Sequence, residues 1–118
     1  MSASQLLRWQ WEGYPRYHRS RFNLLLHIAA VPMFLVGNVA LVAALAQLSW
    51  HIGIGAVVAM VLSVALQGRG HRHEPMPPES FTSPLNAVSR IFLEQWVTFP
   101  RFVLSGRWAR ALRQHQAP

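Results

Sequence analysis

Imidazole and carboxylate side chains gather in two short stretches of this 118-residue chain. The first stretch carries His18 and His27, and the second carries His71, His73 and Glu74. Because the chain has no cysteine, a metal ion could be held only by His, Glu or backbone oxygen. Two imidazoles and one carboxylate are the minimum set for a non-haem iron site with open coordination positions. These side chains therefore predict a metal site, with His18, His27, His71 and Glu74 at the catalytic centre.

The element between the two stretches must bring them together. Residues 22 to 68 carry no Arg or Glu, and this run is about twice the roughly 20 residues that one helix needs to cross a bilayer core. It predicts two spanning helices, over residues 23–46 and 50–66, with Gln47, Leu48 and Ser49 as the turn. A helical hairpin returns to its starting side, so the two stretches become neighbours at its mouth. His27 lies a turn inside the first span, where an ionisable side chain is costly unless it has a partner.

The distribution of Arg predicts the orientation of this hairpin. The net charge of +7 comes from 11 Arg and four Glu. Four Arg precede the first span, seven follow the second, and the turn has none. By the positive-inside rule both termini face the cytoplasm, and we place the protein in a bacterial inner membrane. The basic flanks then suit anionic lipid headgroups, so we expect no nucleic-acid partner.

Two other interpretations of the apolar run fit less well. A secretory signal peptide has one short apolar region before a cleavage site, whereas here a second apolar span follows the first. A soluble helical pair would need several further helices to cover it, and the residues after the hairpin are too few. We therefore predict an all-α membrane protein, a helical hairpin covered by the lipid bilayer. This arrangement leaves room for a homo-oligomer that completes the helical bundle.

The segments outside the hairpin predict amphipathic interfacial helices at both ends of a single membrane domain, residues 1–118. Residues 1–21 form a cytoplasmic N-terminal segment with a short helix from Ser4 to Glu12. Residues 22–68 form the transmembrane hairpin. Residues 69–118 hold a His- and Pro-rich loop, an amphipathic helix and a basic tail.

The second amphipathic helix has a clear predicted start, since Ser83 and Pro84 suit the N-cap and the first helical position. Its apolar positions then follow helical spacing on one stripe: Leu85, Val88, Phe92, Trp96, Phe99 and Val103. The opposite stripe carries Arg90, Glu94 and Arg101. We expect this helix to lie on the membrane or across the hairpin's base, with a kink or break at Pro100.

The order of these motifs resembles that of a small integral-membrane family, the yeast 2-hydroxy fatty acid dioxygenase of phytosphingosine breakdown and its bacterial relatives. The likeness spans residues 14 to 106. In the family's first motif His18, Asn23 and His27 match, while Ser20 and Arg21 replace an Asn-Pro pair. In the second motif Gln67, Gly70 and His71 match, but the acid, Glu74, follows the His by three residues instead of four. This departure makes His73 an alternative ligand to Glu74.

The resemblance implies an Fe(2+)-dependent dioxygenase that uses O₂ to remove one carbon from a 2-hydroxy fatty acid in α-oxidation. Its motif residues imply iron ligands among His18, His27, His71, His73 and Glu74, and substrate contacts from Asn23 and Gln67. A 2-hydroxy acid can chelate Fe(II) through its carboxylate and hydroxyl while its acyl chain lies along the apolar hairpin. Arg69 or Arg72 beside the site could hold the substrate carboxylate by charge-assisted hydrogen bonds.

Two further functions fit the same residues. A non-enzymatic membrane protein would use its His and Arg side chains to organise lipid headgroups or a partner protein. A haem protein would use paired His in the hairpin as axial ligands. His51, beside Trp50, and His115, in the tail, lie away from both stretches, and we expect neither to bind metal.

Overall fold

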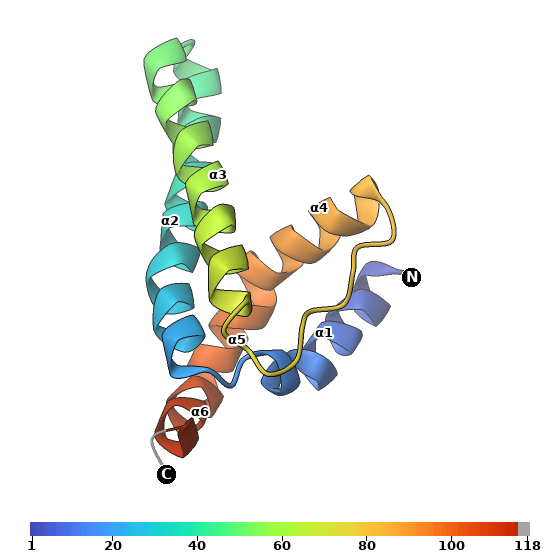
Figure 1. Ribbon diagram of the computed structural model, residues 1–118. Helices are drawn as coiled ribbons and strands as arrows, with labels where there is room; N and C mark the ends of the chain where they lie inside the picture. The colour runs from blue at the N-terminus through green and yellow to red at the C-terminus, as the bar shows by residue number, and fades with distance from the viewer. Residues whose placement is uncertain (116–118) are drawn as a thin grey trace.

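The computed structural model describes residues 1–115, which fold into helices without any strand (Figure 1). The α-helices are α1 (Ala3–Tyr17), α2 (Arg21–Gln47), α3 (Trp50–His71), α4 (Pro84–Leu93), α5 (Phe99–Leu104) and α6 (Arg107–His115). A π-helical turn, η1 (Glu94–Thr98), joins α4 to α5. The all-α fold predicted from the sequence is confirmed.

Helices α2 and α3 form a long antiparallel hairpin that projects from the rest of the molecule (Figure 1). The chain reverses at Leu48, whose left-handed backbone conformation (φ 54°) ends α2 where the turn was predicted. Both helices are long and apolar enough to cross a membrane. They approach each other closely at Gly37, where a Cβ would lie 3.1 Å from the Ala56 carbonyl oxygen. Small residues at such a contact are typical of helix pairs in membranes.

Helix α1 is longer than predicted. It begins after Ser2, whose side chain accepts a hydrogen bond from the Gln5 amide, while the Gln5 side chain accepts one from the Ser2 amide. This reciprocal capping box stabilises a start two residues before the predicted Ser4. The helix continues past Glu12 to Tyr17 and places His18 directly after its last residue.

The segment after the Pro-rich loop differs from its prediction in one important way. Ser83 caps α4 as expected, since its side chain accepts from the Asn86 amide. However, the predicted apolar stripe from Leu85 to Val103 is not continuous, because Leu85 is exposed whereas Phe99 is buried. The cause is η1, in which the Phe99 amide donates to the Glu94 carbonyl five residues earlier. A π turn holds more residues than an α turn and so rotates the following residues to a new face.

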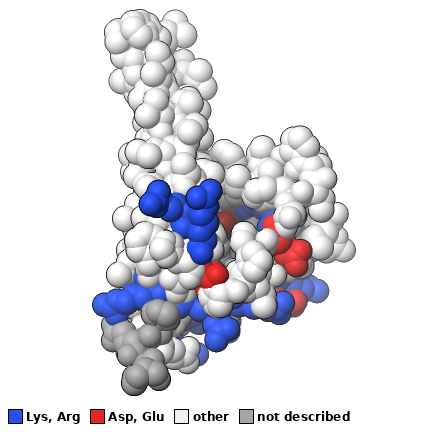
Figure 2. Space-filling model, viewed as in Figure 1, with Lys and Arg blue, Asp and Glu red and all other residues white. Residues whose placement is uncertain are grey.

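The apolar core lies at the base of the hairpin, where α1, α2, α5 and α6 meet. Its buried members are Tyr14, Leu24, Val31, Phe99 and Phe102. Helix α6 closes it, with the Trp108 indole donating to the Leu24 carbonyl at 3.0 Å. Charged side chains surround this base, while the far end of the hairpin carries none (Figure 2). The core therefore packs around the region in which the predicted site residues lie.

Candidate metal centre

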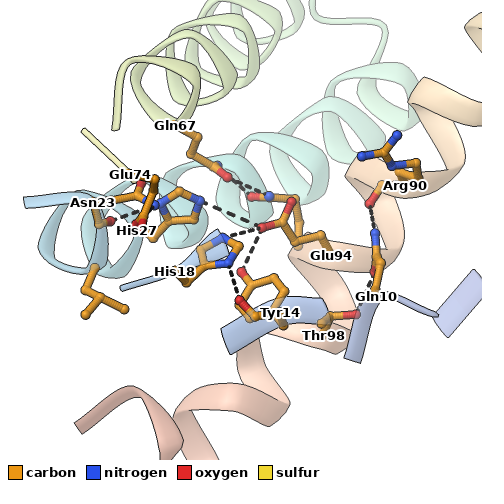
Figure 3. Close-up of polar contacts among 12 residues, drawn as sticks. Gln10, Tyr14, His18, Asn23, His27, Gln67, Glu74, Arg90, Glu94 and Thr98 are labelled. Atoms are coloured by element: carbon orange, nitrogen blue, oxygen red, sulfur yellow. Dashed lines mark hydrogen bonds and ion pairs between the residues drawn. The ribbon is translucent and has the colours of Figure 1, made fainter. Parts of the chain in front are cut away.

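Three imidazoles and one carboxylate meet at the hairpin's base. His18 follows α1, His27 lies in α2, His71 ends α3, and Glu94 begins η1. One ligand atom from each of these residues lies within 4.8 Å of the others. His18 and His27 are only 4% and 0% exposed, and Figure 3 shows both pointing toward Glu94. This group could hold a metal ion.

The two most buried imidazoles each turn one nitrogen to the backbone and the other to the centre. Nδ1 of His18 lies 2.9 Å from the Tyr14 carbonyl oxygen, and Nδ1 of His27 lies 3.0 Å from that of Asn23. Because a carbonyl oxygen can only accept, each Nδ1 must donate its hydrogen, and the Nε2 of the neutral ring is left with a lone pair. Among the described residues neither Nε2 has a hydrogen-bond partner. Metal-bound His is oriented in this way.

The spacing of the donors suits an ion between them. Oε2 of Glu94 lies 3.5 Å from Nε2 of His18 and 3.7 Å from Nε2 of His27. These distances are too long for good hydrogen bonds, but two ligands at about 2.1 Å from one tetrahedral ion lie about 3.4 Å apart. His71 completes the set, with its ring centroid 4.8 Å from that of His18 and 5.1 Å from that of His27. Its Nδ1 is also buried without a partner in the described chain.

The surroundings of Glu94 favour its ionised form although the side chain is largely enclosed. Burial raises its pKa, but His18 and His27, when protonated, and the Tyr14 hydroxyl outweigh burial and lower the pKa to about 2. The Tyr14 hydroxyl donates to Oε2 of Glu94 at 2.7 Å (Figure 3), and the Tyr14 ring stacks on His18 with centroids 3.7 Å apart. Burial, and then the nearby Glu94, raise the pKa of Tyr14. Tyr14 thus remains a donor and fixes both a carboxylate and an imidazole of the group.

Helical spacing predicted Glu94 on the stripe opposite the apolar residues, with Arg90 and Arg101, but the structure places Glu94 at the centre. Helix α4 packs on α1, where the Gln10 side chain donates to the Arg90 carbonyl and the Arg90 guanidinium lies over the Trp9 ring. The π turn then holds Glu94 at the centre and buries Gln95 and Thr98 behind it. Pro100 was the one available signal, because a proline cannot donate the α-helical hydrogen bond and so favours an irregular turn before it.

Glu74 does not join the His residues, which corrects its prediction as a ligand. Its carboxylate accepts hydrogen bonds from the amides of Arg19 and Ser20, at 2.8 and 3.0 Å, and from the Asn23 side chain at 2.7 Å. A carboxylate is favoured there, since the amides at the start of α2 lack partners within the helix and the helix dipole is positive. A tight turn after α3, with the Glu74 amide donating to His71, directs the side chain to this position.

The remaining predicted ligand, His73, lies outside the group as well. Its exposed ring packs on Phe22, with centroids 4.3 Å apart. His51 is exposed near the hairpin turn and stacks on Trp50. The side chain of His115 is not among those that the structure describes.

The four residues expected to contact substrate have different positions. Asn23 is fully buried, and a Cβ at Gly70 would collide with its Oδ1. Gln67 exchanges two hydrogen bonds of 2.8 Å with Gln95, which ties α3 to η1. Gln67 and Arg72 line the cleft beside the centre, whereas Arg69 is exposed and does not line it.

This cleft has a volume of about 720 Å³ and lies among α1, α3, α4 and the loop between α3 and α4. Its lining includes His18, His71 and Glu94 of the centre. The rest of the lining combines apolar residues such as Trp9, Val64, Phe81 and Ile91 with polar ones such as Gln10, Glu12 and Glu79, and most of the surface that faces the cleft is apolar. The volume lies within the range of about 300–1,000 Å³ usual for small-molecule sites, so the centre is open to a ligand from this side.

No related protein adds to this description. Among protein-family models, curated proteins and solved structures, none matches the chain. The likeness to the dioxygenase family therefore depends on the motif residues alone, and the centre on the geometry of this chain.

Proposed function

We propose that this protein is a membrane-bound iron(II)-dependent oxygenase that shortens a 2-hydroxy fatty acid by one carbon. The observation that carries the proposal is the pair of buried Nε2 lone pairs of His18 and His27, which face the ionised Glu94. Lone pairs and a carboxylate at this spacing repel one another, and a metal cation between them, or a proton on one of the imidazoles, removes the repulsion. Three imidazoles and a carboxylate, with no sulfur ligand, suit a non-haem iron(II) site.

The surroundings favour a catalytic ion over a structural ion or a haem. A structural site is closed by protein ligands, whereas the cleft reaches this centre at His18, His71 and Glu94. The four donors converge on one point, which suits a single ion, while axial haem ligands stand on opposite faces of a macrocycle. When bound, iron(II) supplies the redox chemistry with O₂ that side chains lack.

In the proposed reaction one 2-hydroxy acid and one O₂ give the acid one carbon shorter, one CO₂ and one water. The bond between C1 and C2 breaks, C2 is oxidised from an alcohol to a carboxyl group, and the four electrons released reduce O₂. His18, His27, His71 and Glu94 would hold the ion. Arg72 lines the cleft and can pair with the substrate carboxylate, whereas Arg90 donates to the backbone carbonyls of Glu79 and Ser80.

We also propose that the α2–α3 hairpin crosses the membrane with both termini on the cytoplasmic side. Large apolar side chains are exposed along both helices, for example Val39, Val42 and Val58. Helix α4 also exposes apolar side chains, Leu85, Val88 and Phe92, while its Arg90 lies over Trp9 of α1. Exposed apolar surface of this extent marks an interaction with membrane or protein, and the charges gather at the base (Figure 2).

The topology is tested with reporters fused after Pro118 or inserted at Ser49. The proposed hairpin requires them to report opposite sides of the membrane. If both lie on the same side, the hairpin does not span.

The reaction is tested on protein purified anaerobically, loaded with Fe(II) and supplied with 2-hydroxyhexadecanoic acid labelled at its carboxyl carbon. We expect labelled CO₂ and unlabelled pentadecanoic acid, with one O₂ consumed per product. The Glu94→Gln variant serves as the inactive control. If iron-loaded protein leaves the label in the acid across several chain lengths, this substrate class is wrong; if no iron binds, the centre itself is wrong.

A further inference from the structure

We infer that the cleft among α1, α3 and α4 binds the acyl chain of the substrate and that Gly68 keeps the cleft open for it. The identity of the chain as part of a 2-hydroxy acid rests on the proposed function, while the binding site itself follows from the lining of the cleft. The ligand class is a single fatty acyl chain with an acidic end.

The cleft has the polarity that such a ligand requires. The acidic end would lie beside His71 and Glu94, within reach of Arg72. The apolar side chains lie on the remaining walls, contributed by Trp9 of α1, Val64 of α3, Ile91 of α4 and Phe81 of the loop. A ligand with a charged end and a long apolar tail can therefore contact charged and apolar lining residues within the same cleft.

The other hollows in the described structure lack one half of this pairing. A groove along the hairpin, beside Pro32, Gly37 and Ala56, has no charged residue in its lining. A second hollow is lined by His18 on one side and by Arg19, Arg107 and Arg110, and its apolar surface is much smaller than that of the first cleft. Of these three hollows, the first cleft joins the candidate metal centre to the most extensive apolar surface.

The loop between α3 and α4, which forms one wall of the cleft, is held in place by Arg90. Its guanidinium donates to the carbonyls of Glu79 at 2.9 Å and Ser80 at 3.1 Å. It also lies over the rings of Trp9 and Phe81, 4.9 and 4.5 Å from their centroids. These contacts hold the loop against α1 and α4 and so stabilise this side of the cleft.

An apolar route leads from the hairpin surface toward this cleft. Val61 and Leu62 are exposed on α3, and Val64, on the next turn, lines the cleft. Because the exposed part of α3 is the part proposed to lie in lipid, these side chains offer an acyl chain apolar contacts between the bilayer and the cleft.

Gly68 lies on the cleft wall between Gln67 and His71, yet no packing requires a glycine there. A Cβ at Gly68 would meet no atom within 4 Å, in contrast to Gly70, where Asn23 occupies the space. A larger side chain at position 68 would therefore extend into open space at the cleft and leave the helix contacts unchanged. Gly55 is the matched position on the same helix, since it also meets no atom within 4 Å and lies far from the cleft.

The experiment compares wild type, Gly68→Leu and Gly55→Leu, labelled with 2-hydroxyhexadecanoic acid that carries a photoreactive diazirine near its methyl end. In wild type and Gly55→Leu we expect crosslinks to peptides that contain Trp9, Phe81 or Ile91. In Gly68→Leu the crosslinks should fall about tenfold, as expected for overpacking a site of fixed shape. Iron content should be the same in all three proteins, which shows that the centre and fold are intact.

A graded variant and a second substrate sharpen the result. Gly68→Ala should give an intermediate loss of crosslinking, and Gly68→Leu should favour an eight-carbon over a sixteen-carbon 2-hydroxy acid in turnover. Equal crosslinking in all variants, or crosslinks confined to the hairpin turn, would overturn the inference. If the crosslinks follow this pattern but no acid is shortened, the acyl site stands and the proposed oxygenase reaction fails.

Discussion

The two halves of the α2–α3 hairpin, one near the turn and one near the base, differ in the side chains that they expose and bury. In the half that contains the turn, the valines at positions 36, 39 and 42 are more than 60% exposed, while the small residues Gly37, Ala44 and Ala56 are buried. Near the base, polar side chains are buried beside apolar ones such as Leu24 and Val31. These polar side chains are Asn23, His27, Ser63 and Gln67. The half near the turn therefore suits an apolar environment, whereas the half near the base encloses polar side chains within the protein.

Burying polar groups is costly unless they are hydrogen-bonded, and most of those at the base are. Ser63 donates to the Ala30 carbonyl, and Gln67 pairs with Gln95. Three of the four buried side-chain atoms without a partner in the described structure belong to His18, His27 and His71. The unsatisfied atoms thus gather at one point, which is typical of a functional site that is maintained at some expense of stability.

The largest expected difference between the two halves is in metal binding. His27→Ala should remove bound iron, because it deletes a ligand nitrogen that no cysteine can replace. His51→Ala, near the hairpin turn, should retain the wild-type iron content. Metal analysis of both variants after Fe(II) loading checks this, and equal iron content would contradict the assignment of the centre.

Replacing the carboxylates of Glu94 and Glu74 with amides should show which one binds iron and which one stabilises the fold. Glu94→Gln should weaken iron binding by more than about tenfold, because the ligand loses its charge. Glu74→Gln should keep the iron but lower the free energy of unfolding by about 2 kcal/mol, since its amide and side-chain donors lose a charged acceptor. Iron titration and denaturant unfolding of both variants distinguish the roles. If Glu74→Gln lost iron while Glu94→Gln kept it, Glu74 would be the ligand.

A smaller effect on the metal is expected from Tyr14→Phe. This change removes only the hydroxyl that donates to Glu94 and keeps the ring between His18 and Phe102. We expect iron affinity to fall about tenfold, as is usual when a hydrogen-bond partner of a ligand is lost. Tyr17→Phe is the control, since its hydroxyl lies at the exposed Glu79. Unchanged affinity in Tyr14→Phe would mean that the hydroxyl does not support the carboxylate.

A last contrast, in stability alone, is expected between two glycines of α3. Gly70→Ala should lower the free energy of unfolding by about 1–3 kcal/mol, because its Cβ meets Asn23 and Leu26. Gly55→Ala should leave it unchanged or raise it by up to about 1 kcal/mol, since alanine favours the helix and meets nothing. Unfolding in detergent measures both. A harmless Gly70→Ala would show that the base tolerates more movement than this packing implies.

The sequence by itself determined the helical hairpin and the meeting of His18, His27 and His71. A long run without charge, a short polar turn and the return of the chain to its starting side are local properties, and they place the ends of the two helices together whatever the packing around them. The cap at Ser83 was likewise predictable, because it depends only on residues within one turn.

Only the tertiary structure decided which carboxylate joins the imidazoles. Glu74 is the near neighbour of His71 in sequence, but the unpaired amides at the start of α2 compete for it and hold it outside the group. Glu94 comes from a distant segment and reaches the centre because α4 packs on α1 through Arg90 and the π turn breaks the 3.6-residue period. Neither the packing of α4 on α1 nor that change of period can be deduced from helical spacing, since both depend on contacts between segments far apart in the chain.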